Sequence, residues 1–524
     1  MNRFWIPPPP LLHVLVLFVF GVLALPLRAV DWYVAPDGDD AHDGSIEQPF
    51  ATLQRAQSAA SPGDTVFLRG GLYAVSEEQI ARYERIWAYV SYLDKSGTPE
   101  APIRYWAYPG ERPIFDFSAV KPADRRVTAF FVRGSWLHFK GFEIIGVQVT
   151  ILEHTQSICI ENQGSHNIFE QIVMRDGQAI GIYLTRGSHN LVLNCDAYRN
   201  WDYTSQNGLG GNVDGFGGHL RAGGVNNVFR GCRAWFNSDD GFDAINSQEA
   251  VVFENCWAFY NGFSPDFERL GDGHGFKSGG HAGTALDRLP DPMPRHVTRF
   301  CLAVRNKTSG FYANHQIGGQ DWQRNTAVRN PVNFNMLGRL ADNATTVPGY
   351  GHLMRNNLGA LGAVEVSNLD FAASDVEGNS FTLDVVVTEE DFASLDEALL
   401  VLPRQADGSL PEIAFARLTR ESDLIDAGVD DGFDYAGAAP DLGAFEASAA
   451  HAFGPVAWQA GPAGLELEVT APAGWPVEWW QAANPALPAA SWDSLGRGLV
   501  GLDGRATLEL VPSSVPAFFQ LRAD

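Results

Sequence analysis

The sequence predicts an all-β protein whose main part is a parallel β-solenoid with about 24 residues in each coil. Three observations favour this fold class. A seven-residue segment recurs at a constant basic spacing. Each repeat contains short β-type runs separated by Gly, Asn and Ser. No helical periodicity runs through the repeats, so helical and leucine-rich arrays fit poorly.

The recurrent segment carries Cys at its second position in four copies and ends on Asn. These copies are Asn194 to Asn200, Gly231 to Asn237, Asn255 to Asn261 and Phe300 to Asn306, with Cys195, Cys232, Cys256 and Cys301. With Asp176 and Asn330 included, the final positions are separated by 24, 37, 24, 45 and 24 residues. Stacked coils would turn these positions into an Asn ladder and an inward column of buried free thiols. An odd count of five cysteines also argues against a disulfide framework.

The chain divides into three predicted parts. Residues 1–29 look like a signal peptide, with Arg3, an apolar run from Leu11 to Leu25, and a cleavage site after Ala29. A membrane anchor is the alternative, but the run is short for a span. Residues 30–446 form the solenoid domain. Residues 453–524 alternate in β fashion and are interpreted as a small sandwich-like β module of unknown role, in which the Trp residues serve the core.

The charge of the chain restricts its partners. There are 62 acidic and 37 basic residues, a net charge of −25. Nucleic acid is excluded as a partner because phosphate binding needs a basic face. An acidic polymer is also disfavoured unless a metal and local cations reverse the sign at the site. We expect a secreted monomer, extracellular or periplasmic, with no membrane attachment after the signal is removed.

The candidate site is built from copies of a Gly-Phe pair. Asp214-Gly215-Phe216, Asp240-Gly241-Phe242-Asp243 and His274-Gly275-Phe276-Lys277 fall in register. Asp243 and Lys277 are 34 residues apart, and ten of these are an insertion after Asn261, so one coil separates the two side chains. Loops at 201–214 and 262–273 project at the same corner. Asp214, Asp239, Asp240 and Asp243 are therefore expected to converge beside Lys277.

Four clustered carboxylates repel one another unless a cation compensates them. Ca²⁺ suits an irregular oxygen-only site, and no paired His or Cys favours zinc. A lysine beside the metal can act as a general base once it is neutral. Together these groups predict β-elimination from a uronate polymer, with Ca²⁺ neutralising the carboxylate and Lys277 removing the C5 proton. The alternative is that the Asp residues have only a structural role and cap turns. This explains one Asp but not a column of four with a Lys.

These motifs resemble polysaccharide lyase family nine, the pectate lyases with a right-handed parallel β-helix. The resemblance rests on Asp214-Gly215-Phe216, on Asn237 to Asp243 and on Gly275 to Gly280, and it covers about residues 31 to 446. It implies Ca²⁺ on the four Asp positions and a lysine base at Lys277. His274 stands where Asn is expected, and Ser278 where a larger apolar residue is expected. These two departures concern the preferred substrate more than the reaction.

Alternatives remain open on the sequence alone. Pectate (polygalacturonate) is the first choice of substrate, and another uronate polymer would suit the same chemistry. A polygalacturonase-type hydrolase would use the carboxylates as acid and base and would not need Lys277. A non-catalytic polysaccharide-binding β-helix would use the same residues as turn chemistry. Arg221, Lys307 and His315 lie near enough in the repeat to be candidate substrate contacts.

Overall fold

The computed structural model describes residues 29–447, 457–461, 464–471, 473–482, 493–502, 505–510 and 518–523. The predicted signal peptide lies outside the described residues, apart from Ala29. Within the described part of the chain, no helix has the length and apolar character needed to cross a membrane.

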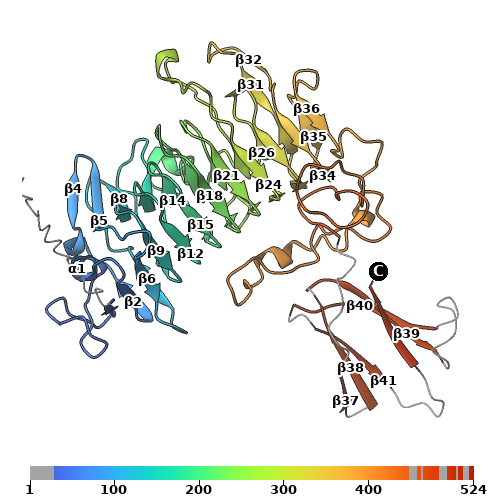
Figure 1. Cartoon of the computed structure of the whole chain (residues 1–524), viewed down its shortest axis with the longest axis horizontal. Coiled ribbons are helices and arrows are strands. Elements are labelled where there is room, and N and C mark those ends of the chain that lie inside the picture. Colours follow the sequence, from blue (N-terminus) through green and yellow to red (C-terminus); the bar gives the residue numbers. More distant parts are fainter. Residues whose placement is uncertain are drawn as a thin grey trace, which may run out of the picture.

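Three long sheets of short, mainly parallel strands build the main domain, and the chain visits them in turn (Figure 1). The first has 12 strands: β1 (Asp31–Val34), β2 (Thr65–Leu68), β6 (Ile103–Ala107), β9 (Leu137–Lys140), β12 (Ile168–Glu170), β15 (Leu191–Leu193), β18 (Asn227–Arg230), β21 (Val251–Glu254), β24 (Val297–Arg299), β28 (Asp321–Gln323), β33 (Leu353–Arg355) and β36 (Asp375–Glu377). We call it sheet A. Sheet B has 10 strands: β3 (Gly71–Ala74), β7 (Pro113–Asp116), β10 (Glu143–Ile145), β13 (Val173–Arg175), β16 (Asp196–Tyr198), β19 (Arg233–Trp235), β22 (Trp257–Phe259), β25 (Leu302–Val304), β29 (Thr326–Val328) and β34 (Leu358–Ala360).

Sheet C carries the candidate site. Its 11 strands are β4 (Arg82–Glu84), β5 (Trp87–Leu93), β8 (Arg126–Val132), β11 (Ser157–Asn162), β14 (Ala179–Leu184), β17 (Phe216–Gly218), β20 (Phe242–Asp243), β23 (Phe276–Lys277), β26 (Ser309–Tyr312), β30 (Val332–Asn335) and β35 (Val364–Ser367). A smaller sheet is formed by β27 (Gln316–Ile317), β31 (Leu337–Arg339) and β32 (Thr346–Pro348), which lie in the chain between β26 and β35. The predicted β-helix is thus confirmed.

The predicted columns exist in the structure, except that Asp176 does not belong to the Asn column, because the register of β13 and β16 places Gly177 opposite Asn200. Asn200, Asn237, Asn261, Asn306 and Asn330 form a buried ladder in which each side-chain amide donates to the next carbonyl oxygen at 3.0 to 3.1 Å. All five cysteines are buried free thiols. Because every ladder bond satisfies two buried polar groups, the turn between sheets B and C is held at a constant geometry along the coils.

A short helix lies near the start of the domain, between β1 and β2. Helix α1 (Leu53–Ala59) begins at Thr52, whose Oγ1 accepts a hydrogen bond from the backbone N–H of Arg55 at 3.1 Å. Leu53 and Ala56 are buried in the first coils. The other helices among the described residues are short 3₁₀ helices: η1 (Glu77–Gln79), η2 (Ser205–Gly208), η3 (Leu286–Arg288), η4 (Glu389–Asp391) and η5 (Glu397–Val401). The helix thus covers the start of the core.

The segment from about residue 381 to 447 covers sheet B instead of extending the coils. Leu399, Leu400 and Phe415 pack against Trp257, Leu302 and other residues of that sheet. Arg404 is tied to Asp196 at 2.7 Å. Phe381 to Thr388 and Glu397 to Leu402 have sequences that fit either strands or a terminal cap; the structure assigns no strand to the first and a 3₁₀ helix to most of the second. The apolar residues of this segment pack against the outer face of sheet B.

The described C-terminal strands form two antiparallel sheets. One contains β37 (Ala457–Gly461), β38 (Gly464–Thr470) and β41 (Arg505–Leu510), and the other β39 (Pro476–Ala482), β40 (Asp493–Leu499) and β42 (Phe518–Ala523). Figure 1 shows them at the C-terminal end of the solenoid. Trp475 and Trp479 are buried in a cluster with Leu467 and Val477, as expected for core residues. The domain limits at 446 and 453 remain a prediction.

Candidate functional site

The outer face of sheet C brings Asp243 and Lys277 together. Phe216, Phe242 and Phe276 stack inside the coil, with ring centroids 5.0 and 4.7 Å apart. Because side chains alternate along a strand, the residue after each Phe points outward. Asp243 pairs directly with Lys277 in the parallel register of β20 and β23. The predicted one-coil spacing is therefore confirmed, and the ten inserted residues loop out between the two strands.

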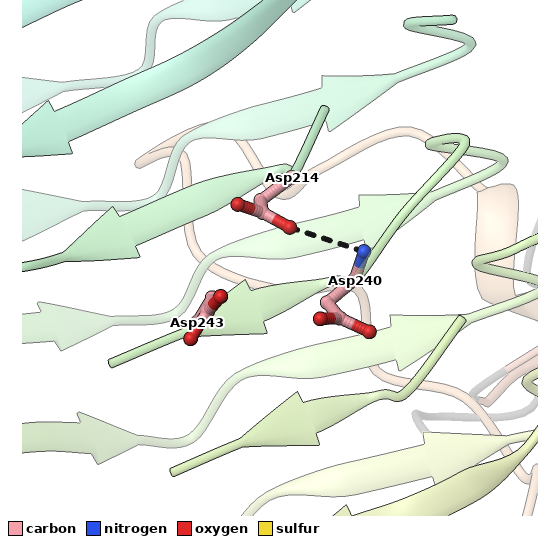
Figure 2. A group of neighbouring side chains, drawn as sticks. All are labelled: Asp214, Asp240 and Asp243. Carbon is pink, nitrogen blue, oxygen red and sulfur yellow. Dashed lines mark hydrogen bonds between the residues drawn. The ribbon is translucent and has the colours of Figure 1, made fainter. Parts of the chain in front are cut away.

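Three of the predicted carboxylates lie close together on neighbouring coils (Figure 2). Asp214 and Asp240 lie at equivalent places just before β17 and β20, and the backbone N–H of Asp240 donates to Asp214 Oδ1 at 3.2 Å. Asp214, Asp240 and Asp243 each offer an oxygen within 4.8 Å of the others. All three are buried. The corner thus holds a compact group of carboxylate oxygens that includes Asp240.

Asp239 belongs to a second group of carboxylates, which includes a residue that the sequence did not single out. Asp239, Asp240 and Asp272 form a second group of oxygens within 4.8 Å. The backbone N–H of Asp272 donates to Asp239 Oδ1 at 2.6 Å. Asp272 belongs to the inserted loop, so the 24-residue period does not apply to it. The sequence feature that could have identified Asp272 is the presence of an acidic residue in the inserted loop at the same corner.

Lys277 lies inside this carboxylate cluster. Its Nζ is 2.9 Å from Asp240 Oδ2, 3.4 Å from Asp243 Oδ2 and 3.8 Å from Asp272 Oδ2. Burial lowers the pKa of Lys277, but the carboxylates of Asp240, Asp243, Asp239 and Asp214 together raise it well above its usual range. Without a cation in the cluster, Lys277 is therefore an ammonium group and forms the main compensation for the acidic side chains.

The carboxylates themselves are destabilised as anions. Burial, followed by the neighbouring Asp243, Asp239 and Asp240, raises the pKa of Asp214 well above its ordinary value. Burial and the charge of Asp240 do the same to the pKa of Asp239. Five carboxyl groups surround a single lysine here, and both groups of possible metal ligands consist of Asp carboxylates alone. A hard divalent cation such as Ca²⁺ fits this donor set and its excess charge.

The two departures from the family motif lie beside the cluster. His274 donates its backbone N–H to Asp240 Oδ1 at 2.7 Å, and its ring stacks on Tyr312 with centroids 4.3 Å apart. Its Nδ1 lies 3.1 Å from Thr308 Oγ1. Burial lowers the pKa of His274, so the ring is neutral. Ser278 is buried next to Lys277, and its hydroxyl has no hydrogen-bond partner among the described residues.

A cavity of about 530 Å³ lies over sheet C next to the cluster, although no residue of the cluster lines it. His219 lines it, and its Nε2 is 3.9 Å from Asp243 Oδ1. Four arginines also line it: Arg126, Arg186, Arg221 and Arg288. This local group of cations contrasts with the net charge of −25. A cavity with cationic walls beside a carboxylate cluster that fits a divalent cation is suited to an extended acidic chain.

The three predicted substrate contacts are not equivalent in the structure. Arg221 is exposed and lines the cavity. Lys307 is directed to the inserted loop, where its Nζ donates to the carbonyl oxygen of Leu270 at 2.8 Å. The Nδ1 of His315 lies 3.0 Å from the hydroxyl of Tyr312, outside the residues that line the cavity. Only Arg221 is therefore placed on the cavity wall, and a role in substrate binding stays a prediction for all three.

Comparisons with known proteins give the family. The model of the Pel9A-like, right-handed β-helix region matches residues 32–357. Pectate lyase L of Dickeya chrysanthemi is 35% identical over 427 residues, covering 79% of this chain and 90% of the relative. A solved rhamnogalacturonan lyase is 45% identical, with a TM-score of 0.73, and covers 75% of this chain and 97% of its own. The solved pectate lyase Pel9A is 34% identical, with a TM-score of 0.65; the match covers 80% of this chain and 96% of Pel9A.

These findings decide between the alternatives that the sequence left open. The relatives that share most of the chain are lyases, which sets aside the glycoside hydrolase and the non-catalytic binding protein. The family model also confirms the right-handed coil that the resemblance implied. The chain belongs to the Pel9A-like family of right-handed parallel β-helix proteins and is a polysaccharide lyase.

Proposed function

We propose that the chain cleaves an acidic, uronate-containing polysaccharide by calcium-assisted β-elimination. Lys277 would be the base, and Asp214, Asp239, Asp240 and Asp243 would hold Ca²⁺, with Asp272 as a further ligand. One observation carries the proposal. Lys277 stands in the same outward column as Asp243, with its amine within 4 Å of carboxylates from two different groups. A base and a cation-binding cluster in contact are what this elimination needs.

Each residue has a definite task in this reaction. When bound, Ca²⁺ would neutralise the uronate carboxylate and acidify the proton on the adjacent C5. Lys277 takes that proton, the electron pair of the C5–H bond forms the C4=C5 double bond, and the C4–O bond breaks. The leaving oxygen is protonated by solvent. The buried carboxylates raise the pKa of Lys277, so the amine becomes a base only where their charge is compensated.

Polygalacturonate is the first candidate substrate. Pectate lyase L of Dickeya chrysanthemi and the solved Pel9A are pectate lyases by name, and each covers more than three quarters of this chain. Rhamnogalacturonan is the second candidate. The rhamnogalacturonan lyase shares 45% of its residues with this chain, against 34% for Pel9A. Both polymers contain galacturonate, so the same cluster and lysine serve either one.

We also propose that the chain is secreted and that its lyase part is the solenoid domain. The predicted signal peptide supports export. The two carboxylate groups and the residues that line the cavity lie between positions 87 and 288, within the solenoid domain.

Analysis of the products tests the proposal. The chain, without its predicted signal peptide, is incubated with polygalacturonate and with rhamnogalacturonan, in Ca²⁺ and in EDTA. We expect oligosaccharides with a 4,5-unsaturated non-reducing end, detected by their ultraviolet absorbance and by mass spectrometry, only when Ca²⁺ is present. Saturated products that also form in EDTA would contradict β-elimination and indicate hydrolysis.

A further inference from the structure

His219 lies between the cavity and the carboxylate cluster. It lines the cavity, and its Nε2 is 3.9 Å from Oδ1 of Asp243, which does not line the cavity. In the outward column of sheet C, Tyr183 pairs with Gly217, and Gly217 pairs with Asp243. His219 follows Gly217 by two residues, so its side chain leaves the same face of the sheet. The imidazole therefore meets side chains from both strands that flank β17.

Gly217 provides the space for this arrangement. A Cβ atom at Gly217 would lie 2.6 Å from Cδ2 and 2.9 Å from Cε2 of Tyr183, which is closer than real Cβ atoms approach. The hydroxyl of Tyr183 is 2.8 Å from His219 Nδ1, and the two rings meet edge to face with centroids 4.7 Å apart. The absence of a side chain at Gly217 thus allows the Tyr183 ring to reach His219.

The two contacts of the imidazole define which nitrogen carries the proton. Nε2 faces a carboxylate oxygen of Asp243, where a lone pair would be repelled and an N–H group attracted. Nδ1 then accepts from the hydroxyl of Tyr183. Burial and the charges of Asp243 and Asp214 raise the pKa of Tyr183, so the hydroxyl keeps its proton and can donate it. Tyr183 therefore fixes the tautomer and the ring orientation of His219.

The Nε2–H group of His219 has no other partner. The atom is buried and forms no hydrogen bond with the described residues, and such atoms are rare in proteins. At 3.9 Å from Asp243 Oδ1, it is about 1 Å beyond hydrogen-bonding distance, so a small rotation of either side chain would join them. Because the atom is not exposed to the cavity, Asp243 is a better-placed partner for it than a bound polymer.

The two oxygens of Asp243 have different neighbours. Oδ2 is 3.4 Å from Nζ of Lys277. Oδ1 accepts from the backbone N–H of Ile245 at 2.7 Å and faces His219. The same carboxylate belongs to the first of the two oxygen groups that fit a divalent cation. Its orientation therefore matters for the cation, because ligand oxygens that repel one another must be held in place by hydrogen bonds from outside the site.

We propose that His219 is a positioning residue for calcium, which holds Asp243 in its ligating orientation and is itself held by Tyr183. The inference rests on the proposed function, since it takes Asp243 as a ligand of Ca²⁺. Hydrogen-bonded partners of this kind orient metal-binding side chains, and their loss weakens metal binding about tenfold to hundredfold. His219 acts through Asp243, so its first effect is on calcium affinity and not on proton transfer to Lys277.

Titration with Ca²⁺, followed by calorimetry, tests this directly. The chain without its predicted signal peptide is first treated with EDTA, which is then removed. His219→Ala should weaken Ca²⁺ binding about tenfold to hundredfold. His219→Gln can place an amide N–H near the position of Nε2 and should recover most of the affinity. Tyr183→Phe keeps the ring but removes the hydroxyl, and it should cause a smaller loss, because His219 is then present but no longer fixed.

His281→Ala is the matched control. His281 lines the same cavity and also has a buried Nε2 without a hydrogen-bond partner among the described residues. Of these two rings, only that of His219 has a nitrogen within 4 Å of a carboxylate in the described part of the chain. His281→Ala should therefore leave calcium affinity unchanged. Thermal unfolding in EDTA shows whether each variant is folded, independently of the metal.

A double-mutant cycle separates the positioning of Asp243 from a general loss of structure. In an Asp243→Asn background, His219→Ala should reduce calcium affinity little further, because the carboxylate that it orients is already absent. In an Asp272→Asn background, it should cause the same fold-loss as in the unsubstituted chain, since Asp272 belongs to the other group of carboxylates.

Three results would overturn the inference. These are an unchanged calcium affinity in His219→Ala, an equal loss in His281→Ala, and the same further loss in both backgrounds. In each case the unsubstituted chain still binds Ca²⁺ and forms unsaturated products, so the proposed function stands. Failure of the proposed function looks different, because the unsubstituted chain would then bind no Ca²⁺ in the titration or would yield no unsaturated products.

Discussion

The amine of Lys277 lies 2.9 Å from Oδ2 of Asp240, and both side chains are buried at one corner of the β-helix. The contact joins two neighbouring coils, since Asp240 precedes β20 and Lys277 ends β23. It also joins the proposed base to the carboxylate that belongs to both oxygen groups. Chemistry at Lys277 is therefore coupled to whatever charge occupies the cluster.

Calcium should stabilise the folded chain. The pKa values of Asp214, Asp239 and Asp243 are raised, with burial as the largest cause of each. The charged forms of these side chains therefore destabilise the folded state at neutral pH. A cation that binds only the folded state stabilises it by about 2.7 kcal/mol at a concentration one hundred times Kd. We expect the thermal midpoint to rise with added Ca²⁺ and to fall again in EDTA.

Asp243→Asn provides the matching control for this experiment. The substitution removes a ligand and one repelling charge, so it should raise the midpoint in EDTA and reduce the increment that Ca²⁺ gives. A midpoint that responds equally to Ca²⁺ in the variant and the unsubstituted chain would place the ion elsewhere.

Asp272 should contribute to calcium affinity although it lies outside the repeat. Its carboxylate joins Asp239 and Asp240 within 4.8 Å. Removing one anionic ligand by Asp272→Asn should weaken Ca²⁺ binding about tenfold in a titration followed by calorimetry. Asp266→Asn, on the same inserted loop but exposed, should leave the affinity unchanged. Equal affinities for both variants would remove Asp272 from the proposed ligands.

His296 should make the fold sensitive to mild acid. Burial lowers its pKa to about 3, and its Nδ1 accepts from the backbone N–H of Val251 at 3.1 Å. In the unfolded chain the pKa is about 6.5, so the unfolded state takes up a proton first as the pH falls. His296 therefore has no effect on the free energy of unfolding above about pH 6.5. Below that pH it lowers the free energy of unfolding by about 1.4 kcal/mol per pH unit.

The matched variant is His296→Asn, which cannot titrate. Urea unfolding between about pH 7 and pH 4 should show a shallower loss of stability in this variant than in the unsubstituted chain. Parallel curves would mean that His296 is already protonated in the folded state.

Phe242 links the core to the site. It is fully buried between Phe216 and Phe276 and directly precedes Asp243. Phe242→Ala should cost about 3–5 kcal/mol of stability and displace Asp243 from the cluster. Phe169→Ala, in an equally buried stack on sheet A, should cost a similar amount. Below both melting temperatures, only the first variant should lose Ca²⁺ affinity; equal affinities would show that the stack does not position the ligand.

The sequence was most informative where the coil period holds. The Gly-Phe pairs around Phe242 and Phe276 predicted the pairing of Asp243 with Lys277, because stacked coils repeat their register. The period carries no information inside an insertion, and this is why Asp272 was missed. Asp239 was placed with the other carboxylates, yet it faces a second group, since side-chain direction at a turn depends on local backbone angles.

The segment after residue 380 illustrates a second limit. Its apolar residues resembled strands, for example Glu397 to Leu402, but they pack on the outside of sheet B. Short apolar runs have no period of their own, so the sequence does not distinguish a strand from a packed 3₁₀ turn. The sequence also could not predict that Glu161 Oε2 has no hydrogen-bond partner among the described residues, because such partners depend on the side chains of the neighbouring coils.

The most direct test of the account is the rate of unsaturated-product formation by Lys277→Ala, beside Lys140→Ala as the control. Lys140 pairs with Glu170 on sheet A, away from the cluster. The account predicts that Lys277→Ala loses about 10²–10⁴-fold in kcat on polygalacturonate or rhamnogalacturonan in saturating Ca²⁺ while it still binds the polymer. Lys140→Ala should keep its activity. A Lys277→Ala variant that forms unsaturated products at the rate of the unsubstituted chain would contradict the central claim.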